Sequence, residues 1–233
     1  MLGFYDYTVW LTYISLASAG AGIMISLYNQ AHPYIGAFFL LICGLCDAFD
    51  GRVARTKKNR TEAQKKYGIQ IDSLADIVCF GVLPACIGNA MIRVIPSHCK
   101  NEIFRPEILL TKPMFYVCYA IIIFYILAAL IRLAYFNVME EERQQTEDGC
   151  RKTYVGLPVT ASALIFPTVL MLQYILPDDV TMLYFIIMAI TGVAFISPFK
   201  VVKPGLRGIL IMVGIGAAEF ILLAIFWWIR APH

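Results

Sequence analysis

Four aspartates stand at spacings that could place their carboxylates around one small volume. Asp47 and Asp50 lie at the end of one strongly apolar segment, and Asp72 and Asp76 lie at the start of another. An unpartnered carboxylate is costly in apolar surroundings, so acids in such positions usually have a functional partner. We interpret the two pairs as a metal site whose chemistry is the transfer of a phosphate-linked group at a membrane surface.

The first pair belongs to a group that follows the i, i+3, i+4, i+7, i+8 pattern of one helical face. The group consists of Asp47, Asp50, Gly51, Ala54 and Arg55. Its small residues leave room for a bulky ligand or a neighbouring helix, and the planar guanidinium at its end could contact phosphate. Taken singly, each small residue could merely pack helices and the arginine could merely anchor the interface. Together with the acids they favour a site.

Asp72 and Asp76 are one turn apart, so they also share a face, at the expected start of the third apolar helix. Gly68 precedes them by one turn and would open a gap where that helix begins. A short connection makes the two helices antiparallel neighbours, which brings the carboxylates together. Their mutual repulsion requires neutralisation, and all-oxygen ligands favour Mg2+ or Mn2+, of which a pair could bridge shared carboxylates.

The apolar composition of the chain indicates that this site lies in a membrane protein. Of the 233 residues, 60% are hydrophobic and only 15% are charged, which is more apolar surface than a soluble core can bury. We therefore expect an all-α, polytopic integral membrane protein with about seven transmembrane helices, give or take one, in a single catalytic domain that spans residues 1–233. The apolar runs are Trp10 to Leu27, Tyr34 to Cys46, Ile77 to Ile92, Met114 to Ile131, Leu157 to Leu176, Val180 to Ile196 and Ile209 to Ile229.

The basic residues are unevenly distributed between the loops, which predicts the orientation in the membrane. One side of an alternating topology carries most of the Lys and Arg, above all the connection from Arg52 to Lys66. Because short loops rich in Lys and Arg stay in the cytoplasm, we expect the N-terminus and the aspartates on the cytoplasmic side of the cell membrane. The formal net charge of +3 is too small to indicate nucleic-acid binding, and the basic loops suit anionic membrane lipids.

At these residues the chain resembles the CDP-alcohol phosphatidyltransferases. The signature of that family is two aspartates, a glycine, an alanine and an arginine, followed by a glycine and two more aspartates, and all of them are present between residues 47 and 76. One departure is the connection of twelve residues from Thr56 to Tyr67, which is basic and longer than usual. The resemblance implies a helical membrane enzyme of that family that depends on divalent metal ions and uses a CDP-linked lipid.

The resemblance also implies a role for each signature residue. The metal ions would be held by Asp47, Asp50, Asp72 and Asp76. The CDP-lipid would be bound by Asp47, Gly51, Ala54, Arg55, Gly68 and Asp72. Asp76 would also act as the catalytic general base, because it would take the proton of an incoming hydroxyl group that attacks the lipid-side phosphorus and expels CMP.

Three further stretches are similar to the phosphatidylserine synthase branch of this family. They are Ile71 to Asp76 with Phe80, Gly81 and Pro84, then Arg132 to Asn137, and finally Tyr154 to Pro158. The resemblance implies CDP-diacylglycerol as donor, L-serine as acceptor, and phosphatidylserine and CMP as products, made by a homodimer. In the second stretch Tyr135 stands where that branch often has a basic residue.

Three residues are candidates for contacts with the acceptor, namely Arg132, Asn137 and Lys152. Arg132 lies within an apolar helix and needs an anionic partner, which could be the aspartates, the nucleotide phosphates or the carboxylate of serine. It could equally extend to the lipid headgroups. Asn137 could instead cap its helix, and Lys152 could anchor its loop.

Two other functions stay open from the sequence. The same chemistry could act on another alcohol, such as glycerol 3-phosphate or inositol phosphate, although a phosphorylated acceptor would need further basic residues near Arg132. Acids within a membrane could also line the path of a small cation transporter. Transport is disfavoured because the aspartates gather near one membrane face and no repeat relates the two halves of the chain.

Overall fold

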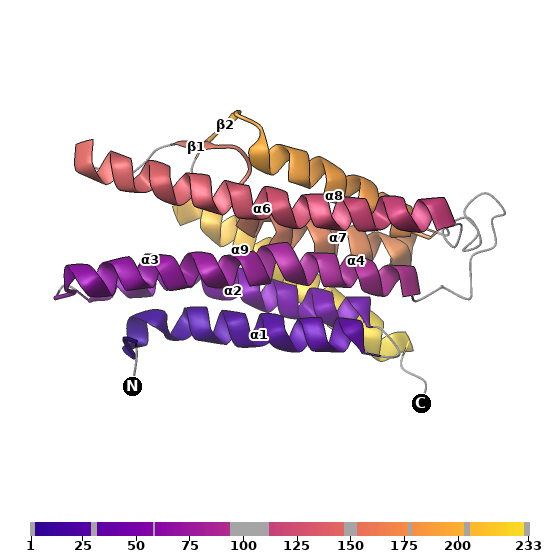
Figure 1. Cartoon of the computed structure of the whole chain (residues 1–233). Helices are drawn as coiled ribbons and strands as arrows, with labels where there is room; N and C mark the ends of the chain where they lie inside the picture. The colour runs from indigo at the N-terminus through magenta and orange to yellow at the C-terminus, as the bar shows by residue number, and fades with distance from the viewer. Residues whose placement is uncertain are drawn as a thin grey trace.

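The computed structural model describes residues 3–28, 32–57, 59–93, 112–146, 153–176, 179–202 and 206–230. Within these ranges the chain forms a bundle of long helices that run side by side (Figure 1). The α-helices are α1 (Trp10–Leu27), α2 (Pro33–Thr56), α3 (Glu62–Asp76), α4 (Leu83–Arg93), α6 (Lys112–Thr146), α7 (Ser162–Ile175), α8 (Thr181–Ile196) and α9 (Leu206–Arg230). Two short strands, β1 (Thr153–Val155) and β2 (Lys200–Val202), pair antiparallel at one end of the bundle.

Helices α3 and α4 form one continuous rod. The stretch between them, η2 (Ile77–Val82), stays helical but adopts π geometry, a distortion that is frequent at functional sites. With this rod counted once, the described ranges contain seven helical rods, which is the number that the apolar runs predict. The start of α1 and the end of α9 lie at opposite ends of the bundle, as an odd number of rods requires (Figure 1).

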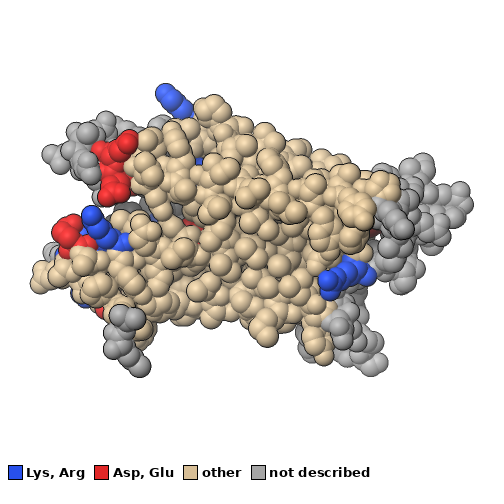
Figure 2. Space-filling view, viewed as in Figure 1, with Lys and Arg blue, Asp and Glu red and all other residues tan. Residues whose placement is uncertain are grey.

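The surface is divided into charged ends and an uncharged middle. In the described part of the chain, four helical segments are long and apolar enough to cross a membrane: Tyr7–Leu27, Pro33–Ala54, Glu62–Arg93 and Pro113–Glu142. Three shorter apolar helices accompany them: Val159–Ile175, Thr181–Ile196 and Leu210–Leu222. Figure 2 shows charged side chains at the two ends of the molecule and a broad uncharged band between them. This distribution fits a middle embedded in lipid, and the all-α membrane fold is confirmed.

Buried tyrosines join the third rod to its neighbours. Pro84 lacks the N–H that would normally bond the carbonyl of Phe80 one turn earlier. The hydroxyl of Tyr125, on α6, donates to that carbonyl at 2.6 Å. The hydroxyl of Tyr184, on α8, donates to the carbonyl of Pro84 at 2.8 Å. Both tyrosines are fully buried, so α6 and α8 are fixed to the third rod immediately beyond Asp76.

The third rod begins earlier than its apolar run predicts. Its start is a capping box, in which the Thr61 hydroxyl accepts from the Gln64 N–H at 3.2 Å and the Gln64 side chain accepts from the Thr61 N–H at 3.1 Å. The first turns of α3 are polar, so the apolar run marks only the part of the rod beyond Asp76. The prediction that Asp72 and Asp76 open this helix is therefore wrong, because both lie well inside the rod. Most of the long connection after Arg55 is helix, because α2 continues to Thr56 and α3 begins at Glu62.

Candidate active site

The structure brings the signature aspartates together from two rods. The carboxyl groups of Asp50 on α2 and Asp72 on α3 lie close enough to interact electrostatically. Asp76 interacts electrostatically with Asp47, Asp50 and Asp72, and Asp47 interacts with Asp72. All four carboxylate-bearing residues are partly buried. The spacing in the sequence thus corresponds to one local group of acids.

These acids lie where the two rods separate. Helix α2 packs on α4 and η2, whereas its packing with α3 in the described residues is much slighter. At this end of the bundle Figure 2 shows a hollow between the end of α6 and the start of α3, with acidic and basic atoms visible inside it.

The donor atoms in this group suit a hard cation. Carboxyl groups gathered this closely are stabilised by a shared proton or by a cation between them. All-oxygen donor sets are typical of sites for Mg2+ and Mn2+. As the side chains stand, no set of three or more His, Cys, Asp or Glu residues within the described ranges is arranged to hold an ion. Side chains of the aspartates would have to rotate to surround one.

Gly51 lies on the open side of α2. It is exposed, and a Cβ added there would meet nothing within 4 Å. No neighbouring helix uses the space beside it, so helix packing does not account for this glycine in the described structure. Ala54 lies one turn further on, and its carbonyl accepts a long hydrogen bond of 3.5 Å from Arg60. Arg55 occupies the last turn of α2, but its side chain lies outside the described part.

Gly68 lies inside α3, and the prediction that it marks the start of the helix is wrong. A Cβ at this position would come within 2.6 Å of the Arg60 Nη2 atom. The space beside Gly68 is thus occupied by a guanidinium group from the loop. Nothing in the sequence singles Arg60 out, because its place depends on the fold of the loop and not on a helical spacing.

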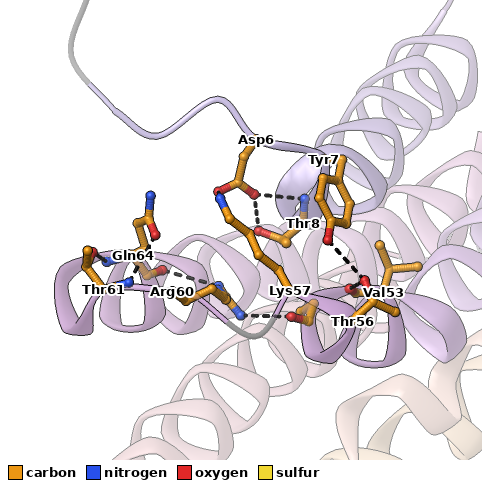
Figure 3. Close-up of polar contacts among 10 residues, drawn as sticks. Asp6, Tyr7, Thr8, Val53, Thr56, Lys57, Arg60, Thr61 and Gln64 are labelled. Atoms are coloured by element: carbon orange, nitrogen blue, oxygen red, sulfur yellow. Dashed lines mark hydrogen bonds and ion pairs between the residues drawn. The ribbon is translucent and has the colours of Figure 1, made fainter.

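The N-terminal segment contacts the end of α2. Lys57 donates to the Asp6 carboxylate at 2.8 Å, and the Tyr7 and Thr56 hydroxyls lie 3.2 Å apart (Figure 3). Asp6 also accepts from the N–H and the hydroxyl of Thr8. The hydrogen bonds from the Lys57 ammonium and the Thr8 hydroxyl lower the pKa of Asp6 from 3.8 to about 2. These contacts were not predicted, since the partners are about fifty residues apart.

Arg132 is buried between α6 and the turn before α7. It is only 6% exposed, so the alternative that it extends to the headgroups is wrong. Its Nε atom donates to the Leu157 carbonyl at 3.2 Å, and its guanidinium lies 5.3 Å from the centre of the Phe136 ring. The turn that presents this carbonyl needs Gly156, whose φ of 76° is strained for other residues. The Gly156 N–H donates to the Phe199 carbonyl at 2.7 Å, beside the strand pair.

Asn137 contacts α3 from α6. Its side-chain amide donates to the Ser73 hydroxyl at 2.8 Å, and Ser73 is the neighbour of Asp72 in the chain. Helix α6 continues to Thr146, so the alternative that Asn137 caps this helix is wrong. The third acceptor candidate, Lys152, lies outside the described residues. Two of the three candidates thus belong to the helix that borders the hollow.

A helical bundle with an uncharged middle and interacting carboxylates from two of its rods is expected of a membrane enzyme that binds metal ions and phosphate groups. The model of the CDP-alcohol phosphatidyltransferase family matches residues 8–197, and the chain belongs to this family. The family transfers phosphatidyl groups from CDP-alcohols and uses divalent metal ions. The protein is therefore a phosphatidyltransferase, as the sequence predicts in preference to a transporter.

Individual relatives come from bacteria, yeast and archaea. The chain is 27% identical over 202 residues to the CDP-diacylglycerol--serine O-phosphatidyltransferase of Helicobacter pylori, covering 80% of this chain and 70% of that protein. It is 33% identical over 146 residues to the enzyme of the same name from Saccharomyces cerevisiae, covering 61% and 44%. It is 27% identical over 154 residues to the archaetidylserine synthase of Methanothermobacter thermautotrophicus, covering 66% and 53%.

Proposed function

We propose that the protein transfers the phosphatidyl group of CDP-diacylglycerol to the hydroxyl of L-serine, giving phosphatidylserine and CMP. The observation that carries the proposal is the electrostatic interaction between the Asp50 carboxyl group of α2 and the Asp72 carboxyl group of α3. The choice of serine is supported by the relatives, because the names of the bacterial, yeast and archaeal proteins all specify serine.

Mg2+ or Mn2+ would be held by Asp47, Asp50, Asp72 and Asp76, and when bound would neutralise the pyrophosphate of the CDP-lipid. The open position at Gly51 leaves room for the nucleotide beside these acids. Ala54, Arg55 and Gly68 would complete the wall of the CDP site, as the family signature implies. Helix α2 would thus supply one side of the donor site, and α3 the other.

Asp76 would accept the proton of the serine hydroxyl. The hydroxyl oxygen forms the new bond to the lipid-side phosphorus, and the bond from that phosphorus to the CMP oxygen breaks, so CMP carries away the electron pair. Asp76 is suited to this task because it is the last residue of α3 and interacts with all three other aspartates. The π geometry of η2 begins immediately after it.

The acceptor would lie between these acids and α6. The buried Arg132 guanidinium would pair with the serine carboxylate, since a charge-assisted bond of this kind is strong where water is excluded. Asn137, already beside Asp72 through Ser73, would orient the amino acid. Lys152 would contribute a further positive charge.

The site would face the cytoplasm of a cell membrane. The support is that Lys57 follows the end of α2 and that Lys65 and Lys66 lie near the start of α3, and these two helices carry the aspartates. A homodimer would be the working unit, as the resemblance to the family implies.

The test is acceptor competition on protein purified in detergent. With CDP-diacylglycerol and Mg2+ or Mn2+ present, we expect L-serine to yield phosphatidylserine and stoichiometric CMP. Glycerol 3-phosphate and inositol phosphate should yield little lipid product at the same concentration. A lipid product from glycerol 3-phosphate or inositol phosphate, but none from serine, would show that the acceptor is wrong while the chemistry is right.

A further inference from the structure

Arg60 lies in the loop between the two rods that carry the aspartates. Its Nη1 atom donates to the Ala54 carbonyl at 3.5 Å, and its Nη2 atom donates to the Gln64 carbonyl at 3.2 Å (Figure 3). The first acceptor belongs to the end of α2, and the second to the first turn of α3. One guanidinium therefore joins the two helices next to the region where a nucleotide would enter.

The guanidinium occupies space that small residues leave. A Cβ at Gly68 would meet Nη2 at 2.6 Å, so the Arg60 head lies directly against this position. On its other side is the backbone of Ala54. Arg60 is thus in contact with two of the small residues that the proposed function assigns to the CDP site.

The charge of Arg60 is poorly compensated. An arginine offers five N–H donors and keeps its positive charge. Among the described residues, Nε is buried without a hydrogen-bond partner, and the two recorded bonds of this side chain go to neutral carbonyls. The carboxylates nearby are paired elsewhere, Asp6 with Lys57 at 2.8 Å and Glu62 with Lys65 at 2.7 Å. A guanidinium with an unpaired N–H and no anionic partner among these bonds is well suited to a phosphate, whose oxygens match its planar geometry.

We propose that Arg60 binds a phosphate of the CDP moiety, which makes it a further substrate-binding residue. This inference rests on the proposed function. Without nucleotide, the guanidinium rests on the two carbonyls and fills the space beside Gly68. When the nucleotide enters, Arg60 exchanges these bonds for phosphate oxygens, and the 3.5 Å bond to Ala54 is long enough to be given up at little cost.

The test compares nucleotides with and without phosphate on protein in detergent. Binding of CDP and of cytidine is measured by isothermal titration calorimetry for the wild type, Arg60→Gln and Arg60→Lys. Loss of one charge-assisted bond should weaken CDP binding by about 10- to 100-fold in Arg60→Gln, and less in Arg60→Lys, which keeps the charge but not the planar fork. Cytidine binding should change by less than about twofold, since the expected contact is to phosphate.

Lys65→Gln is the matched control, because Lys65 is an exposed cation on the neighbouring turn whose partner is Glu62. It should leave the affinity for both probes unchanged. Equal losses for CDP and cytidine in Arg60→Gln would reveal a merely structural role and overturn the proposal. Unchanged CDP binding in both Arg60 variants would overturn it as well.

Turnover of the wild type, measured on the same preparation, keeps the two proposals apart. If the wild type releases CMP with serine while Arg60→Gln binds CDP normally, only the role of Arg60 is wrong. If the wild type neither binds CDP nor releases CMP, the proposed function fails and the role of Arg60 fails with it. Thermal unfolding of each variant shows whether it is folded. If Arg60→Gln is not folded, CDP and cytidine binding by Arg60→Lys tests the proposal instead.

Discussion

Asp76 stands at the junction between a regular helix and a π-helical stretch, within reach of the three other acids. Asp76→Asn keeps the shape of the side chain but removes the charge and the proton acceptor. We expect turnover to fall roughly 100- to 10,000-fold, while CDP binding is largely retained. Paired measurements of CMP release and CDP binding check this.

Asp50→Asn is the companion variant, because Asp50 would bind metal without acting as the base. It should first raise the Mg2+ or Mn2+ concentration needed for half-maximal activity. Wild-type turnover in Asp76→Asn would remove the general-base assignment while leaving the metal assignment in place.

Two glycines near the site should respond to alanine in opposite ways. At Gly68 the new methyl group meets only the flexible end of Arg60, and alanine favours a helix interior by up to about 1 kcal/mol. At Gly156 the backbone φ is 76°, and the methyl group would lie 2.8 Å from the Phe195 carbonyl oxygen. Gly156→Ala should therefore cost about 1–3 kcal/mol of stability, and Gly68→Ala should cost none. Thermal unfolding in detergent compares them, and equal destabilisation would contradict this account of both positions.

At the scale of elements, the N-terminal segment is tied to α2 by the ion pair between Asp6 and Lys57. The pKa of Asp6 is lowered to about 2, so the pair stabilises the fold above the ordinary pKa of 3.8 and this contribution is lost as the pH falls toward 2. Because Asp6 is partly exposed, we expect Asp6→Asn to cost at most about 1 kcal/mol near neutral pH. Unfolding of both proteins at pH 6 and pH 2 should show a difference that disappears at the lower pH. If the stability difference between the wild type and Asp6→Asn grew as the pH fell, the predicted role of this ion pair would be contradicted.

Tyr125 ties α6 to the third rod at the carbonyl that Pro84 leaves without its helical donor. Tyr125→Phe removes the buried hydroxyl that donates to this carbonyl and should cost about 1–3 kcal/mol. Because η2 adjoins Asp76, we also expect kcat to fall while the KM for CDP-diacylglycerol changes little. Unfolding and steady-state kinetics measure the two effects.

Tyr119→Phe is the control, since Tyr119 also lies on α6 and donates to Asn89 on α4 at 2.8 Å, further from Asp76 along both helices. It should lower stability without lowering kcat. A similar loss of kcat in both variants would mean that stability, rather than the geometry next to Asp76, limits turnover.

At the scale of the whole molecule, the sequence predicts the rods far better than their ends. Each apolar run became a helix because lipid leaves a spanning backbone no alternative to internal hydrogen bonds. The polar extensions, of α3 back to Glu62 and of α6 on to Thr146, carry no apolar signal. The sequence pattern therefore does not predict them. The gathering of the aspartates followed from helical spacing, whereas Arg60 and Asp6 depend on tertiary contacts that no local pattern encodes.

The last helix lies outside the region that the family model matches, which ends at residue 197. Helix α9 packs on α2 and α7. Its buried Glu219 accepts a hydrogen bond from Thr168 of α7, a polar contact that fixes α9 against the bundle in surroundings where such contacts replace the hydrophobic effect. Helix α2, which carries Asp47 and Asp50, is thus supported by a helix beyond the matched region.

The most direct measurement is a crystal structure with Mn2+ and CDP-diacylglycerol bound, in which anomalous scattering locates the metal. The account predicts manganese between α2 and α3, in contact with carboxylates from both rods, and the CDP pyrophosphate beside it. Manganese bound elsewhere, with the acids of α2 and α3 turned to separate surroundings in a preparation that still makes phosphatidylserine, would contradict the central claim.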